Sequence, residues 1–189
     1  MLNMELTQRH IADTKLVPNR TVLLEHFPKH AVVAELGVDE GRYSEKILKM
    51  AAPRALHLID PWDSERYGER KMRIVGDKFK KQIDSGQVVI HRGRCVDVMK
   101  GFADDFFDWV YLDASHRYRE TLEELELCRL KVKAGGLIAG HDYAAGNVDR
   151  AIRYGVVEAV NEICVKYDYR LAYLTNESRR YLSFALRKA

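Results

Sequence analysis

The stretch Glu35-Leu36-Gly37-Val38-Asp39-Glu40-Gly41-Arg42-Tyr43-Ser44 decides the fold of this chain. It overlaps the end of an apolar run over 31–36 and passes directly into a segment with helical spacing over 42–50, so Gly37 and Gly41 bracket a turn from strand to helix. Glycine lets the backbone come close to a ligand, and the first such turn of a doubly wound sheet is a common ligand site. A glycine turn that holds no ligand is the alternative.

Outward from this turn, predicted strands alternate with predicted helices. Apolar residues recur at helical spacing over 42–50, 121–132 and 148–166. Strands that alternate with helices indicate an α/β fold, a single Rossmann-like domain whose mostly parallel sheet has helices on both faces. The seven predicted strands are near-continuous apolar runs, as in a sheet covered on both faces, and span 31–36, 55–60, 87–91, 107–113, 136–139, 169–174 and 181–186.

The two ends of the chain depart from this alternation. Only residues 175–180 separate the last two predicted strands, and a parallel crossover needs roughly a dozen residues, so these strands must form an antiparallel hairpin. Residues 1–30 fit two short helices, with Asn19 capping the second, and would form a helical cap over the sheet edge or the site. Residues 31–189 make up the main domain.

Composition bounds the class of protein. The 189 residues carry a net charge of +3, with acids and bases interspersed, which does not indicate a nucleic-acid partner. The basic stretch from Arg66 to Lys81 has acids mixed into it and is interpreted as a solvated helix face, with a site for an anionic substrate as the alternative. Neither a membrane span nor a secretory signal is evident, so we expect a cytoplasmic location. Three separated cysteines indicate reduced, buried thiols.

Residues at the ends of the first three strands can hold an adenosyl compound. Asp60 closes the strand over 55–60, where its carboxylate can accept both ribose hydroxyls, although Asp before Pro is also a turn signal. Glu35 can face a positively charged methionine end, and Ser44 can bind the carboxylate. Trp62 could flank the ligand or merely pack. The remaining expected contacts are Gly37, Val38, Gly41 and Tyr43 around the glycine turn, Asp113, and Gly93, Arg94 and Cys95, whose strand-end turn would bound the adenine.

Titratable side chains gather at the ends of the fourth and fifth predicted strands. Asp113 follows the fourth strand, and His141 and Asp142 follow the fifth, on the same rim of the sheet. These three side chains could converge on one divalent cation, with carboxylates and water suiting Mg²⁺ or Mn²⁺. The alternative is a structural role, such as capping the next helix.

His116 is the candidate general base. An ordinary histidine has a pKa near 6.5, and His116 comes shortly after Asp113, the other expected catalytic residue. A surface histidine that pairs with a nearby glutamate is the alternative. No serine stands in a Gly-x-Ser-x-Gly elbow, so the sequence does not indicate a hydrolase of that class.

The chain resembles methyltransferase family 24, which is related to macrocin-type sugar O-methyltransferases and belongs to the class I S-adenosylmethionine-dependent enzymes. The resemblance rests on Ala34-Glu35-Leu36-Gly37-Val38, Leu58-Ile59-Asp60-Pro61-Trp62, Leu112-Asp113-Ala114-Ser115-His116 and Gly140-His141-Asp142-Tyr143, taken in order. It implies S-adenosylmethionine contacts from Glu35, Gly37, Gly41, Ser44 and Asp60. For the metal-dependent members it also implies cation ligands at Asp113, His141 and Asp142, and a catalytic base at His116. His141-Asp142 stands where related enzymes often have paired acids, and Gly93-Arg94-Cys95 where many have Gly-Asp-Ser.

These observations predict transfer of a methyl group from S-adenosylmethionine to a hydroxyl of a small-molecule acceptor, with help from a divalent cation as an option. A metal-independent N- or C-methyltransferase and a non-catalytic binder of adenosyl ligands remain as alternatives. A nicotinamide-dependent dehydrogenase is disfavoured because the Gly-x-Gly-x-x-Gly pattern is absent. Homo-oligomers are possible through the N-terminal helices.

Overall fold

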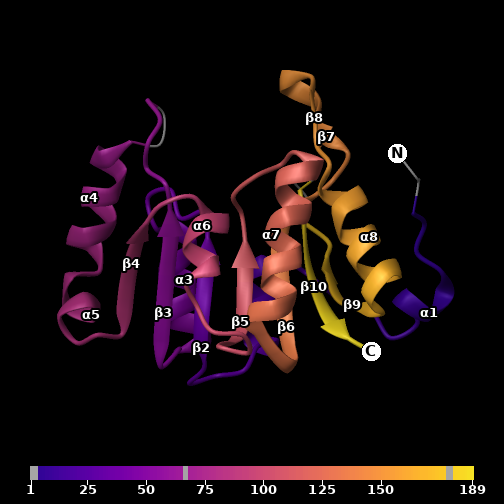
Figure 1. Ribbon diagram of the computed structural model, residues 1–189, viewed down its shortest axis with the longest axis horizontal. Coiled ribbons are helices and arrows are strands. Elements are labelled where there is room, and N and C mark those ends of the chain that lie inside the picture. The colour runs from indigo at the N-terminus through magenta and orange to yellow at the C-terminus, as the bar shows by residue number, and fades with distance from the viewer. Residues whose placement is uncertain (1–3, 66–67, 178–180) are drawn as a thin grey trace.

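An eight-stranded sheet in the order β1-β9-β10-β6-β5-β2-β3-β4 forms the centre of the molecule (Figure 1). This computed structural model describes residues 4–65, 68–177 and 181–189. β10 runs antiparallel to its neighbours β6 and β9, which confirms the predicted hairpin, and the other neighbouring strands are parallel. The strands are β1 (Lys15–Val17), β2 (Val32–Leu36), β3 (Ala55–Asp60), β4 (Val88–Arg92), β5 (Phe107–Leu112), β6 (Val132–Tyr143), β9 (Tyr169–Thr175) and β10 (Leu182–Lys188).

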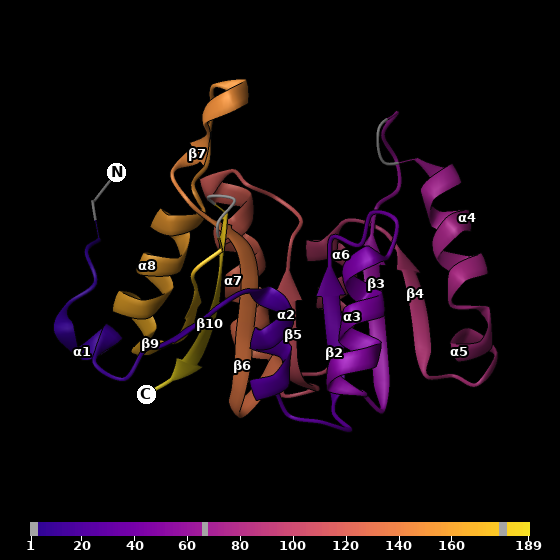
Figure 2. The same cartoon turned by 180° about the vertical axis from the view of Figure 1, so that it is seen from behind.

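Helices cover the two faces of this sheet, as expected for a doubly wound fold (Figures 1 and 2). One face carries α6 (Cys95–Lys100), α7 (Tyr118–Lys131) and α8 (Val156–Tyr167). The other carries α2 (Arg20–Leu23), η1 (Leu24–His26) and α3 (Arg42–Ala51). At the two ends of the sheet lie α4 (Glu69–Lys78) and α5 (Lys80–Asp84) beside β4, and α1 (Gln8–Ile11) beside β9. Each face has its own cluster of buried apolar side chains, so two cores hold the layers together.

The structure differs from the sequence prediction at several elements. All seven predicted strands are present, and β1 adds an eighth between α1 and α2, where only helices were expected. The strand predicted over 136–139 begins at Val132. The helix predicted from residue 148 begins at Val156, because η2 (Val148–Arg150) and a small hairpin of β7 (Gly146–Asn147) and β8 (Ile152–Arg153) precede it.

The carboxyl ends of the parallel strands meet at one rim of the sheet, at the top of Figure 1. The β7–β8 hairpin projects beyond this rim. The basic stretch includes α4, where Lys71 pairs with Asp39, and Lys78 pairs with Glu45 at 3.0 Å. Arg66, which begins that stretch, lies outside the described residues.

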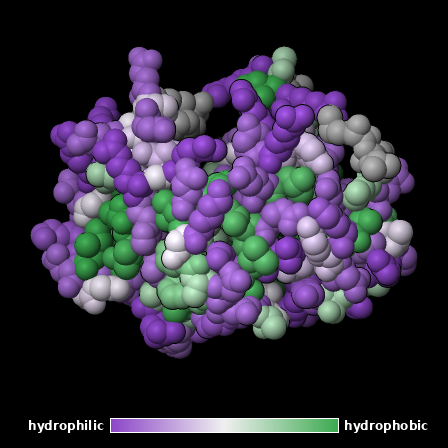
Figure 3. Space-filling model, in the orientation of Figure 1, coloured by the Kyte–Doolittle hydropathy of each residue, from purple (hydrophilic) through white to green (hydrophobic). Residues whose placement is uncertain are grey.

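The surface facing the viewer in Figure 3 is mostly hydrophilic, with apolar side chains showing between the polar ones. No helix within the described ranges is long and apolar enough to cross a membrane. Cys95, Cys128 and Cys164 are all buried free thiols, as expected from the sequence.

Candidate active site

The glycine turn after β2 lies directly against the end of β5. Gly37 has a φ of +87°, and a Cβ atom there would come within 2.2 Å of the Asp113 carbonyl oxygen. Gly41 has a φ of +69° and immediately precedes α3. The turn therefore requires glycine at Gly37 for two reasons, its conformation and its close approach to β5.

Glu35 and Ser44 face each other inside the molecule beneath this turn. Glu35 is 1% exposed and Ser44 has no exposed surface, and the Ser44 hydroxyl donates a hydrogen bond to the Glu35 carboxylate. Burial raises the pKa of Glu35 to about 8, against the opposing effect of the Ser44 hydrogen bond. The carboxyl group is therefore largely protonated at neutral pH unless a cation comes close to it.

Asp60 joins two of the strand-end turns. Its carboxylate accepts hydrogen bonds from the backbone N–H groups of Val38 at 2.8 Å, Asp39 at 3.1 Å and Trp62 at 2.9 Å. The turn-building role that Asp60-Pro61 suggests is thus present, and the ribose contact stays a prediction. Trp62 is completely buried and its indole N–H donates to the Asp39 carbonyl at 3.0 Å, so its ring packs beneath the turn.

The turn after β4 lies beside Asp60, since the Gly93 N–H donates to the Asp60 carbonyl at 3.1 Å. Arg94 is exposed, whereas Cys95 is buried, and burial raises the pKa of its thiol. The predicted adenine-binding turn is therefore next to the predicted ribose-binding residue. Tyr43, in the first turn of α3, is buried, with its ring 4.3 Å from that of Tyr111 on β5.

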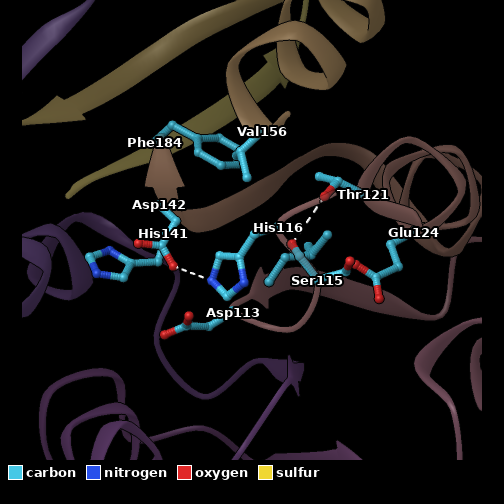
Figure 4. Close-up of a pocket in the computed structure, with 10 residues that line it drawn as sticks. Asp113, Ser115, His116, Thr121, Glu124, His141, Asp142, Val156 and Phe184 are labelled. Atoms are coloured by element: carbon cyan, nitrogen blue, oxygen red, sulfur yellow. Dashed lines mark hydrogen bonds and ion pairs between the residues drawn. The ribbon is translucent and has the colours of Figure 1, made fainter. Parts of the chain in front are cut away.

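Asp113, His116 and Asp142 form a compact acid–base cluster at the rim (Figure 4). One ligand-capable atom from each lies within 4.8 Å of the others. His116 Nε2 is 2.5 Å from Asp142 Oδ2, and this hydrogen bond raises the pKa of His116 above its usual value. The ring of Tyr154 stacks on that of His116 with the centroids 4.6 Å apart. The predicted base therefore has a carboxylate partner that orients it.

His141 points away from this cluster, as Figure 4 shows. Its Nδ1 is 2.9 Å from the Ser183 hydroxyl and 4.0 Å from a Glu177 carboxylate oxygen. Burial lowers the pKa of His141. The structure thus brings together Asp113, Asp142 and His116, where the sequence prediction placed His141 as the third cation ligand.

Arg20 is a charged residue of the site that the sequence did not reveal. It begins α2, and its guanidinium Nη1 lies 3.0 Å from Asp113 Oδ2. The same guanidinium stands 4.7 Å from the centre of the Tyr43 ring. No motif marks this arginine, because 93 residues separate it from its partner.

Glu124, on α7, is a second residue missed by the sequence analysis. It lines the hollow that also contains His116 and Asp142, and its Oε2 is buried without a hydrogen-bond partner among the described residues. Burial raises the pKa of Glu124 to about 7. The sequence analysis did not single out Glu124 within the helical pattern over 121–132, because its burial depends on how α7 packs against the loop that carries His116.

Comparisons with known proteins agree with this architecture. Residues 34–143 match the model of a methyltransferase domain, methyltransferase family 24. No curated protein sequence matches the chain. A candidate rRNA methylase from Clostridium thermocellum superposes with a TM-score of 0.69 at 13% identity, over 92% of this chain and 99% of that one.

Two further solved structures share the fold. The O-methyltransferase from Bacillus cereus, in complex with S-adenosylhomocysteine, has a TM-score of 0.64 at 14% identity, over 89% of this chain and 78% of that one. The pyocyanin biosynthetic protein PhzM has a TM-score of 0.62 at 12% identity, over 85% of this chain, which spans only 51% of PhzM. Because the family model covers more than half of the sequence, the chain belongs to methyltransferase family 24, with the fold of the class I methyltransferases.

Proposed function

We propose that this protein transfers a methyl group from S-adenosylmethionine to a hydroxyl of a small-molecule acceptor, with His116 as general base. The observation that carries the proposal is the His116–Asp142 pair at the strand-end rim, 2.5 Å between Nε2 and Oδ2. The family match supports the methyl transfer, and the glycine turn beside Asp60 supports the adenosyl cofactor.

The geometry of His116 suits proton removal from an acceptor. When Nε2–H donates to Asp142, the Nδ1 atom carries a lone pair, and the described residues offer Nδ1 no hydrogen-bond partner. The acceptor oxygen attacks the methyl carbon, its proton passes to Nδ1, and the carbon–sulfur bond breaks with its electrons remaining on sulfur. The products are the methyl ether and S-adenosylhomocysteine, and most of the acceleration comes from alignment of the reacting atoms.

The donor set of Asp113, His116 and Asp142 also fits a divalent cation, since two carboxylates and an imidazole suit Mn²⁺ or Mg²⁺. Such an ion would lower the pKa of the acceptor hydroxyl. His116 cannot serve as cation ligand and general base through the same lone pair. Arg20 already neutralises part of the charge of Asp113, which favours the metal-independent use of the cluster.

The acceptor class is proposed as a small molecule because the rim carries mixed charges instead of a continuous basic surface. The structural relatives include one named as an rRNA methylase and one named as an O-methyltransferase, at identities that show the fold alone. An N- or C-methyltransferase and a non-catalytic binder of adenosyl ligands are the competing functions.

The test couples cofactor binding to turnover. We expect micromolar binding of S-adenosylhomocysteine by calorimetry, and transfer of a radiolabelled methyl group to an acceptor from a library of hydroxylated small molecules. His116→Asn should keep that binding and lower turnover about 100-fold or more. His30→Asn, at an exposed histidine with a φ of +52°, is the matched control. Absence of binding to the wild type would contradict the function, and equal turnover in His116→Asn would contradict the base.

Dependence on pH and on chelator separates the two uses of the cluster. A general base must be unprotonated, so turnover should rise as the pH passes the pKa of His116, which Asp142 holds above its usual value. Chelator should leave the rate unchanged if His116 acts as the base. A rate that collapses with EDTA and returns with Mn²⁺ would instead assign the cluster to a cation.

A further inference from the structure

The ion pair between Arg20 and Asp113 lies at the carboxyl end of β5, beside the glycine turn that follows β2. Arg20 comes from the N-terminal segment and Asp113 from the end of β5, so the pair joins two distant parts of the sequence across the glycine turn. Both side chains keep part of their surface exposed, 29% for Arg20 and 25% for Asp113. A ligand can therefore reach both charges.

Arg20 is held in place independently of Asp113. Its backbone N–H donates to Glu177 Oε1 at 2.6 Å, and its carbonyl accepts a hydrogen bond from the Tyr43 hydroxyl at 3.0 Å. Asn19 caps the helix that Arg20 begins, by accepting from two backbone N–H groups. The guanidinium also stacks over the Tyr43 ring. The fold thus fixes the position of Arg20, and Arg20 would stay there if a ligand replaced its contact with Asp113.

The other side chains near the glycine turn that could bind an anionic group already have partners. The Ser44 hydroxyl, predicted to bind the cofactor carboxylate, has no exposed surface and donates to Glu35. Lys71, on α4, pairs with Asp39. Arg20 is the cation that contacts Asp113 among the described residues. An anion that binds beside Asp113 would therefore meet Arg20.

We propose that the Arg20–Asp113 pair is the receptor for the zwitterionic amino-acid end of the cofactor, with Arg20 binding the carboxylate and Asp113 the ammonium. This assignment rests on the proposed use of S-adenosylmethionine. A zwitterion presents one charge of each sign a few bonds apart, and a neighbouring cation and anion are its electrostatic complement. The guanidinium is planar and can bind a carboxylate through two parallel hydrogen bonds, which a serine hydroxyl cannot do.

Calorimetry with three ligands tests this inference. The probes are S-adenosylhomocysteine, its decarboxylated analogue, and methylthioadenosine, which lacks the amino acid altogether. We expect the wild type to bind S-adenosylhomocysteine about 10 to 100 times more tightly than the decarboxylated analogue, the range of a charge-assisted hydrogen bond. Arg20→Ala should lower the affinity for S-adenosylhomocysteine by that factor and leave the affinities for the other two ligands unchanged.

Three further variants are titrated with the same three ligands. Arg20→Lys should recover part of the lost affinity, because it keeps the charge and loses the two-pronged geometry. Asp113→Asn should weaken both ligands that contain the ammonium and spare methylthioadenosine. Arg54→Ala, at an exposed arginine before β3, should bind all three ligands as the wild type does.

The possible contrary results are distinct. If Arg20→Ala weakens methylthioadenosine as much as S-adenosylhomocysteine, Arg20 acts through the fold and the inference is wrong. If the wild type binds S-adenosylhomocysteine and its decarboxylated analogue equally, the carboxylate has no receptor at Arg20. If the wild type binds none of the three ligands, the proposed function fails and the receptor with it.

Discussion

The contact between Gly37 and the Asp113 carbonyl fixes the spacing of the site at the level of single residues. Asp113 N–H donates to the Leu36 carbonyl at 2.7 Å, so β2 and β5 stay paired up to the point where the glycine turn leaves the sheet. The turn can then pass over the end of β5 only if no side chain intervenes. The Asp113 carboxylate thereby lies beside the glycine turn, where the cofactor is proposed to bind.

Replacing Gly37 by alanine should destabilise the protein far more than the strain of a positive φ alone would. Gly86 provides the matched control, since its φ of +77° is similar and a Cβ there would meet nothing within 4 Å. We expect Gly86→Ala to cost about 1 kcal/mol of unfolding free energy, and Gly37→Ala more than about 3 kcal/mol because of the clash with Asp113. Denaturant titration measures both values. Equal losses would show that the close approach at Gly37 does not constrain the fold.

The sequence predicted the residues of the cluster better than their orientation. Asp113, His116 and Asp142 could be expected at the rim because they follow the ends of predicted parallel strands. Neighbouring residues in a strand point to opposite sides, and no periodicity shows which of His141 and Asp142 faces the crevice. In the structure Asp142 turns to His116 with a φ of +55°, a backbone conformation that the sequence does not reveal.

At the scale of elements, a histidine pair couples β3 to β4. His57 Nδ1 lies 2.9 Å from His91 Nε2, and the two rings stack with centroids 5.2 Å apart. The edges of Phe102 and Phe107 pack against His57. Burial, reinforced by His91, lowers the pKa of His57 to about 4, and burial also lowers the pKa of His91. Both lowered pKa values mean that protonation of this pair is disfavoured in the folded protein.

Acid should therefore weaken the association of these strands. The pKa of His57 is lower in the folded than in the unfolded state, so its contribution to stability is complete above pH 6.5 and is lost as the pH falls towards about 4. The loss at pH 4 amounts to roughly 3 kcal/mol for His57. His57→Phe keeps an aromatic ring and removes the titration, so its unfolding free energy should depend less on pH in that window.

Denaturation of the wild type and of His57→Phe at pH 7.5 and pH 4.5 measures this difference. The comparison is needed because Glu35 and Glu124 have raised pKa values and shift stability in the opposite direction, towards greater stability as they become protonated in the folded protein. Both carboxyl groups are present in either variant and their effects cancel. Parallel pH profiles of the two proteins would refute the role of His57.

Sequence-based prediction of the fold failed at the short elements. β1 has three residues and only Val17 is buried, so no alternation could identify it, and its pairing with β9 depends on residues far along the chain. The start of α8 was predicted too early because the β7–β8 hairpin contains apolar residues at spacings compatible with a helix. Longer elements such as β3 and α7 were predictable because their burial extends over several turns or strand repeats.

At the scale of the whole molecule, the N-terminal segment contributes to one of the two cores. Leu23 and Leu24 have no exposed surface, and Phe27 is 2% exposed. Phe27 packs edge-on against Trp109 with ring centroids 5.0 Å apart, and the Trp109 indole N–H donates to the Pro28 carbonyl at 3.2 Å. This face of β5 thus depends on residues that precede the expected start of the main domain at residue 31.

Deleting residues 1–30 should consequently unfold the protein and not merely uncover the site. Loss of three large buried side chains costs roughly 6 kcal/mol or more, which approaches the whole stability of a typical domain at about 5–15 kcal/mol. We expect the shortened chain to lack a cooperative thermal transition by circular dichroism, whereas deletion of residues 1–5 should leave the transition close to that of the full chain. A chain of residues 31–189 that melts cooperatively and binds S-adenosylhomocysteine would instead establish the N-terminal segment as a separable cap. The same deletion removes Arg20. A shortened chain that still folds should therefore bind S-adenosylhomocysteine no more tightly than the decarboxylated analogue.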